Sequence, residues 1–196
     1  MHFMPDTEDE DSAAETFWPE GYKQVIRDTV SAWVRTQLNG GSNFQDIYQK
    51  QYSERYSNQE EFLNKLSDMV AIGAENGADD AFDEIVEAFL SEAALPAMRK
   101  YAHYTSPEAL SDPIKEQLRQ VIIDEYSQDN IYCYAYQVGY QSKISTFDQY
   151  INMIADLVIT GAINGADDML GAIYRTFYDH GPLLPARRYP RRLKMW

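Results

Sequence analysis

The chain contains a single cysteine, Cys133, among its 196 residues. One cysteine excludes an intramolecular disulfide and any zinc site built from several cysteines, and it fits a reducing compartment. We therefore interpret Cys133 as a small buried hydrophobe and expect a cytoplasmic protein.

Long apolar runs are missing as well, and so are basic residues near the N-terminus. No run of about 18 consecutive apolar residues occurs, so no membrane-spanning helix is predicted. The first 20 residues contain seven acids and no Lys or Arg, which excludes a signal peptide. We expect residues 1–20 to form an acidic flexible leader.

The common catalytic signatures are absent from the sequence. There is no Gly-x-Gly-x-x-Gly, no Walker loop and no Gly-x-Ser-x-Gly, and the three histidines, His2, His103 and His180, are widely separated. Missing motifs do not exclude an enzyme, but they leave no basis for naming one. We therefore expect no catalytic residue, no metal and no cofactor, and we favour a function other than catalysis.

The composition indicates a folded and strongly acidic protein. Hydrophobic residues make up 44% of the chain, and 31 acids against 17 bases give a net charge of −14. This charge disfavours direct binding of nucleic acid by the body of the protein. The last ten residues differ, because they hold Arg187, Arg188, Arg191, Arg192 and Lys194 and no acid.

Two segments of the chain are similar to each other at an offset of 88 or 89 residues. The octet Gly73–Asp80 matches Gly161–Asp168 at seven of eight positions, within a longer correspondence of about 22–103 with about 110–192. We interpret this as an internal duplication with a pseudo-twofold relation between two helical repeats, 21–105 and 106–183, followed by a basic aromatic tail at 184–196.

Each repeat is predicted to be all-α with four helices, or about eight helices in total, because apolar residues recur every three or four positions. In the first repeat the first two helices span about 21–38 and 43–55, and the third opens with a capping box of Ser57 and Glu60. In the second repeat the first helix is expected to start at Asp112-Pro113. The third is expected to start at a box of Thr146 and Gln149.

The repeated octet is open to three interpretations. In the first, Asn76-Gly77 ends the third helix with glycine in the left-handed conformation. In the second, the third and fourth helices are continuous, and Gly73 with Gly77 lets the matching glycines approach closely. In the third, two polar clusters hold cations. These clusters are Asn76, Asp79 and Asp80, and Asn164, Asp167 and Asp168. We favour the two structural interpretations without choosing between them.

An acidic helical surface occurs in the first repeat only. Its residues are Glu75, Asp79, Asp80, Asp83, Glu84, Glu87 and Glu92. Solubility alone would explain such a surface, and binding of a basic partner is the alternative. Asp80, Asp83, Glu84 and Glu87 are also loosely similar to the acidic helices of all-α nucleotide pyrophosphohydrolases, which would imply a metal-dependent enzyme. The second repeat has Gly171, Ala172 and Arg175 at the last three of these positions.

Our leading hypothesis is a non-enzymatic acidic interaction protein that binds a basic, nucleic-acid-binding protein. Its sharpest form is a DNA-mimic inhibitor of the antirestriction or anti-CRISPR kind. One alternative is the pyrophosphohydrolase-like enzyme. The other is a structural protein that forms homo-oligomers through faces rich in its 15 tyrosines and through exchanged tails. The predicted partner-binding residues are Glu75, Asp79, Asp80, Asp83, Glu84, Glu87, Arg187, Arg188, Arg191 and Arg192. For the basic tail we favour an internal clamp, in which it folds back on the acidic body or the acidic leader, over nucleic acid or a membrane surface.

Overall fold

The computed structural model describes residues 22–39, 42–96, 116–117, 119–121, 123–124 and 130–183. Within these ranges every regular element is helical, which confirms the all-α prediction. The elements are α2 (Tyr22–Asn39), α3 (Ser42–Ile47), the π-helical turn η1 (Tyr48–Tyr52), α4 (Gln59–Leu90), α6 (Asn130–Ala135), the π-helical turn η2 (Tyr136–Tyr140) and α7 (Phe147–Tyr178). The leader at 1–20, the predicted helix start at Asp112-Pro113 and the tail at 184–196 lie outside the described residues.

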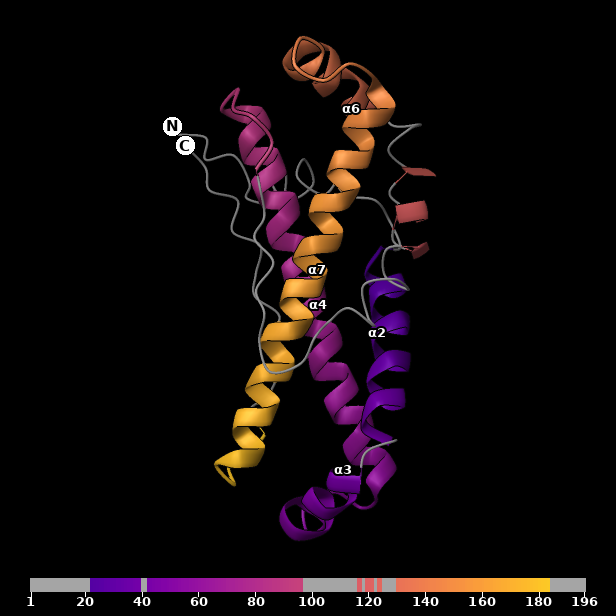
Figure 1. The fold of residues 1–196 in the computed structure, drawn as a ribbon, viewed down its shortest axis with the longest axis vertical. Helices are drawn as coiled ribbons and strands as arrows, with labels where there is room; N and C mark the ends of the chain where they lie inside the picture. Colours follow the sequence, from indigo (N-terminus) through magenta and orange to yellow (C-terminus); the bar gives the residue numbers. More distant parts are fainter. Residues whose placement is uncertain are drawn as a thin grey trace, which may run out of the picture.

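Two long helices, α4 and α7, dominate the fold (Figure 1). Each has 32 residues and runs without a break through its Asn-Gly step, at Asn76-Gly77 in α4 and Asn164-Gly165 in α7. The predicted third and fourth helices of each repeat are therefore a single helix. The prediction of about eight separate helices is wrong for this reason, and so is the interpretation that Asn76-Gly77 ends a helix.

The glycines of the octet explain why the helices continue. A Cβ on Gly73 would lie 2.5 Å from the carbonyl oxygen of Gly165, and a Cβ on Gly77 would collide with the backbone of Gly161. The reverse contacts, from Gly161 to Gly77 and from Gly165 to Gly73, are equally close. The pairing shows that α4 and α7 cross antiparallel with their backbones in contact. The packing at this crossing offsets the roughly 1 kcal/mol by which each interior glycine disfavours a helix.

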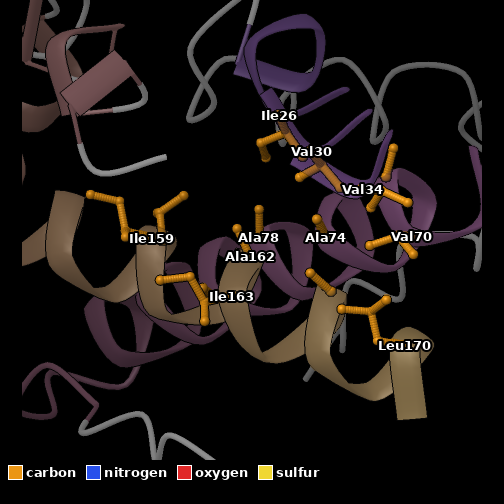
Figure 2. Close-up of a cluster of buried hydrophobic side chains, with 14 of the residues drawn as sticks. Ile26, Val30, Val34, Val70, Ala74, Ala78, Ile159, Ala162, Ile163 and Leu170 are labelled. Atoms are coloured by element: carbon orange, nitrogen blue, oxygen red, sulfur yellow. The ribbon is translucent and has the colours of Figure 1, made fainter. Parts of the chain in front are cut away.

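Helix α2 packs on the side of this crossing. Ile26, Val30 and Val34 recur every four residues along α2 and are fully buried. Figure 2 shows them beside the small residues of α4, with the apolar side chains of α7 below. The buried residues labelled in that view are Val70, Ala74 and Ala78 of α4 and Ile159, Ala162, Ile163 and Leu170 of α7. Alanines at the contact allow α2 to lie close to the crossing.

The described elements form two sets with the same order and lengths. Helix α3, η1 and α4 have 6, 5 and 32 residues, as do α6, η2 and α7. The Tyr52 hydroxyl donates to the Gly181 carbonyl at 2.8 Å, and the matching Tyr140 hydroxyl donates to the matching Ala93 carbonyl at 3.2 Å. Each tyrosine therefore joins the start of one set to the end of the other.

The ends of α4 and α7 are also alike, with one correction to the predicted caps. Thr146 accepts from the Gln149 amide at 3.2 Å, which confirms the predicted N-cap of α7. The N-cap of α4 is Asn58, whose side chain accepts from the Glu61 amide at 2.8 Å, so the predicted box of Ser57 and Glu60 is one residue off. Asparagine is as good an N-cap as serine, and Asn58 also has a glutamate three residues later.

Within the described ranges, none of the helices is both long and apolar enough to cross a membrane.

Candidate functional site

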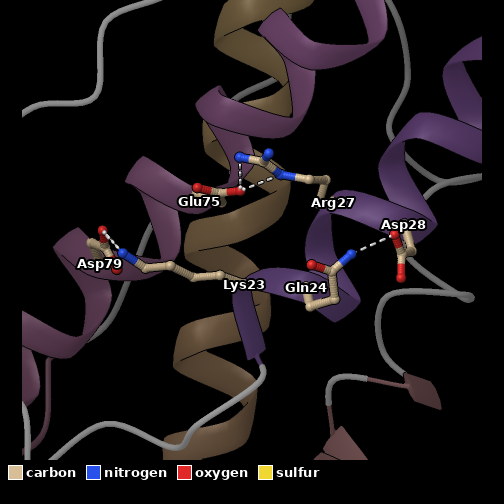
Figure 3. A network of polar contacts seen from close by, with 6 residues as sticks. All are labelled: Lys23, Gln24, Arg27, Asp28, Glu75 and Asp79. Carbon is tan, nitrogen blue, oxygen red and sulfur yellow. Dashed lines mark hydrogen bonds and ion pairs between the residues drawn. The ribbon is translucent and has the colours of Figure 1, made fainter.

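Two of the predicted partner-binding acids, Glu75 and Asp79, face α2 (Figure 3). Arg27 of α2 donates to a single Glu75 carboxylate oxygen through Nε at 3.2 Å and Nη2 at 3.0 Å. Lys23 Nζ lies 3.3 Å from the Asp79 carboxylate. Because the two bases and the two acids are each four residues apart, one turn of α2 matches one turn of α4. These acids therefore pair with bases inside the fold.

Burial governs the ionisation of Glu75. Its side chain is only 3% exposed. Burial raises the pKa of this carboxyl above its ordinary value, and the Arg27 guanidinium opposes the shift without cancelling it. Lys23 also lowers the pKa, whereas Asp79 raises it slightly. Glu75 is thus a structural carboxyl whose charged form is disfavoured by burial. A partner would not reach it.

The other four predicted acids of α4 are at or near the surface. Asp80 and Glu84 are exposed, and Asp83 and Glu87 are half-buried. These four residues, which we call the acidic ridge, follow the stretch of α4 that pairs with α2. They recur every three or four positions along the C-terminal half of α4, so they lie on one side of this helix, although the Asp83 Oδ1 atom is buried.

Exposed apolar side chains lie at the same end of the molecule as the acidic ridge. In Figure 1, α6 lies at the end of the molecule where α4 terminates. A Cβ on Gly139 of η2 would touch the Phe89 ring at 3.6 Å, which fixes this proximity. Leu90, Tyr134 and Val138 are 63%, 61% and 64% exposed. We call the acidic ridge together with these three residues the acidic-apolar end.

The opposite end of the molecule has the same backbone elements and a different surface. Asp46 and Lys50, an ion pair at 3.6 Å, occupy the positions that match Tyr134 and Val138. On α7 the positions matching Asp83, Glu84 and Glu87 are Gly171, Ala172 and Arg175. Among the described residues, the acidic ridge, Tyr134 and Val138 therefore occur at one end of the molecule only, whereas Leu90 is matched at the other end by Tyr178, which is 85% exposed. Sequence reasoning found the acids of the ridge and missed Tyr134 and Val138, although comparing the two halves position by position would have revealed them.

The polar residues of the octet do not form equivalent clusters in the two helices. Asp79 pairs with Lys23 in α4, whereas Asp167 of α7 is completely buried and Asn164 nearly so. In the part of the chain that the structure describes, no group of three or more His, Cys, Asp or Glu residues is arranged to hold a metal ion.

The remaining predicted features are distributed over the molecule. Cys133 is half-buried rather than buried, and its sulfur accepts from the Gln137 amide at 3.6 Å. Tyr52, Tyr140 and Tyr150 are almost fully buried and pack in the core. The tail arginines Arg187, Arg188, Arg191 and Arg192 lie outside the described residues, as do His2 and His103.

No known protein family, curated protein or solved structure matches this chain.

Proposed function

We propose that the protein is a non-enzymatic interaction protein that binds a basic protein partner through its acidic-apolar end. The observation that carries the proposal is the difference between the two ends of the molecule. Both ends keep the same glycine contacts and tyrosine hydrogen bonds, yet of the two only one carries the acidic ridge and the exposed Tyr134 and Val138, whereas the exposed Leu90 is matched at the other end by the exposed Tyr178. Acids that served solubility alone would be equally useful at the matching positions of α7.

The spacing of the acidic ridge suits a partner that binds nucleic acid. From Asp80 to Glu87 the ridge carries four carboxylates along about 10 Å of helix, or one for about every 3.5 Å. A DNA strand presents one phosphate charge about every 3.4 Å along its axis. The net charge of −14 would also raise the association rate with a basic protein. A DNA-mimic inhibitor of the antirestriction or anti-CRISPR kind is the form of the proposal that this spacing supports.

The exposed apolar residues would give the surface an apolar centre, which an acidic helix alone lacks. Protein interfaces are enriched in aromatic residues at their centre and surround them with a polar rim. Tyr134, Val138 and Leu90 would supply such a centre, with the acidic ridge at its edge. A partner with apolar residues among its basic ones is therefore favoured over one that offers charge alone.

An affinity pull-down with matched variants tests the proposal. The test variant is Asp80→Asn, Glu84→Gln and Glu87→Gln. The control is Glu54→Gln, Asp68→Asn and Glu116→Gln, which removes the same number of charges from exposed positions elsewhere. We expect a basic protein to be retained by the wild type and the control, lost by the test variant, and released by competing DNA.

Equal retention of every captured protein by the two variants would refute the role of the ridge. If competing DNA does not release the captured basic protein, DNA mimicry is refuted, and the proposal of an acidic interaction surface remains.

The proposal includes an origin and a location for the protein. The two halves would be copies of one helical unit, since the octets match and the Thr29 hydroxyl donates to Gln117, its counterpart 88 residues later, at 3.1 Å. The single cysteine supports a cytoplasmic location.

A further inference from the structure

We infer that the acidic-apolar end of one molecule binds the basic C-terminal segment, residues 184–196, of a second molecule of the same chain. The inference rests on the proposed function, because it assigns an occupant to the same surface. The basic partner would then compete with this segment, so that self-association regulates access to the surface.

The chemistry of the segment complements the surface in two respects. It contains five bases and no acid, with arginines in adjacent pairs at Arg187-Arg188 and Arg191-Arg192. Arginine forms strong charge-assisted hydrogen bonds with carboxylates such as those of the acidic ridge. Tyr189, Leu193 and Trp196 provide apolar groups for the exposed Leu90, Tyr134 and Val138. Opposite charge and apolar contact are thus available together.

The reach of the segment favours a second molecule over the segment's own chain. Helix α7 runs about 22 Å from the glycine crossing to Tyr178, and the acidic ridge begins about 7 Å from the crossing in the opposite direction along α4. After α7 the chain stays at its own end of the molecule, because the Tyr52 hydroxyl holds Gly181 beside η1.

The ridge is therefore roughly 30 Å or more from the point where the segment departs. Leu183 packs against the core, and Arg188 lies at most about 17 Å of extended chain beyond it. Even fully extended, the first pair of arginines cannot reach the far end of the ridge at Glu87, which is roughly 40 Å from Tyr178, so all four arginines cannot bind along the ridge of their own chain together. The ridge of a second molecule has no such limit, and mutual exchange of segments would close a dimer.

Cys133 allows a direct test in the full-length chain. It is the only cysteine and it precedes Tyr134 at the acidic-apolar end. A bimane label on Cys133 loses emission on contact with a tryptophan, and Trp196 ends the segment. The labelled chain carries Trp196→Phe and keeps Trp18 and Trp33, so only the quenching that increases when an unlabelled chain is added reports a contact with Trp196 in trans.

We expect the unlabelled wild-type chain to quench the label in a concentration-dependent and salt-sensitive way. An unlabelled chain with Trp196→Phe is the matched control and should not quench. Adding Asp80→Asn, Glu84→Gln and Glu87→Gln to the labelled chain should raise the concentration for half-maximal quenching by roughly tenfold or more. Adding Glu54→Gln, Asp68→Asn and Glu116→Gln should leave it unchanged.

Two outcomes would overturn the inference. One is that a second labelled chain, which keeps Trp196, is quenched independently of concentration while an added unlabelled chain quenches neither label, which would indicate an intramolecular contact. The other is no quenching together with a monomeric mass for the unlabelled wild type in sedimentation at low salt. A dimer that becomes monomeric when Arg187, Arg188, Arg191 and Arg192 are changed to Gln would support it.

This test and the pull-down can fail separately. A basic partner lost by the ridge variant would uphold the proposed function even if the segment does not bind in trans. Quenching in trans without any such partner would uphold self-association alone.

Discussion

A methyl group added at Gly77 would report directly on the crossing of α4 and α7. The new Cβ in Gly77→Ala would collide with the carbonyl oxygen of Gly161 and would lie 2.8 Å from its carbonyl carbon and 2.9 Å from the amide nitrogen of Gly165. All three are backbone atoms, so no side chain can turn aside to make room. The two helices would have to separate along the line where Ala74, Ala78 and Ala162 now pack.

The expected size of this effect follows from two opposing contributions. Alanine favours a helix over glycine by roughly 1 kcal/mol. Overpacking a close contact typically costs about 1–3 kcal/mol, and more where the backbone must move. Because the backbones must separate, the cost lies at or above the upper end of that range, and we expect Gly77→Ala to lower the free energy of unfolding by about 2 kcal/mol or more.

Chemical denaturation followed by circular dichroism measures this change. Gly139→Ala is the matched control, since its Cβ would meet only the Phe89 ring, at 3.6 Å, which is an ordinary contact. We expect the control to change stability by less than about 1 kcal/mol. A Gly77→Ala variant as stable as the wild type would show that helix propensity outweighs packing, and the close crossing would be wrong.

Three further predictions concern the helix ends, the buried carboxyl and the apolar surface. Glu92 and His180 follow α4 and α7 with φ of 55° and 54°, so changing either to Gly should raise the thermal midpoint by relieving roughly 1 kcal/mol of left-handed strain. Burial raises the pKa of Glu75 above its ordinary 4.5. The free energy of unfolding of the wild type, relative to that of Glu75→Gln, should therefore fall as pH rises from about 4.5 through the folded pKa. Urea titrations measure this difference, and a difference that stays constant with pH would contradict the prediction. Tyr134→Asp with Val138→Lys copies the ion pair of the matching positions, so circular dichroism should be unchanged while binding of the basic partner falls by roughly tenfold or more; unchanged binding would exclude the apolar residues from the interface.

The helical faces could be predicted from the sequence because the spacing of apolar residues is a local property. Ile26, Val30 and Val34 lie in the core as that spacing indicates. The continuity of α4 through Asn76-Gly77 could not be predicted in the same way, since local propensity disfavours it and a distant pair of glycines stabilises it. The relevant signal was non-local, namely glycines four apart in both halves.

The candidate site was predictable in part for a related reason. The spacing of the acids showed which of them share a face of α4, but not which face α2 covers. Lys23 and Arg27 are four residues apart, like Asp79 and Glu75, and this match would have indicated that these acids are paired. The tail arginines remain a prediction, because they lie outside the described residues.

The acids of α4 therefore divide according to the length of α2. Where α2 covers α4, Glu75 forms an ion pair with Arg27 and Asp79 forms one with Lys23. The charges of these two acids are therefore balanced inside the fold. Beyond Lys23 the helix α2 contributes no further base, whereas α4 continues for three more turns. On α7 the position matching Asp80 keeps an acid, Asp168, but the other three matching positions hold Gly171, Ala172 and Arg175, so the shared fold does not require acids at those three. The acidic ridge lies beside the exposed Tyr134 and Val138, and these residues together form the surface at which we propose that a partner binds.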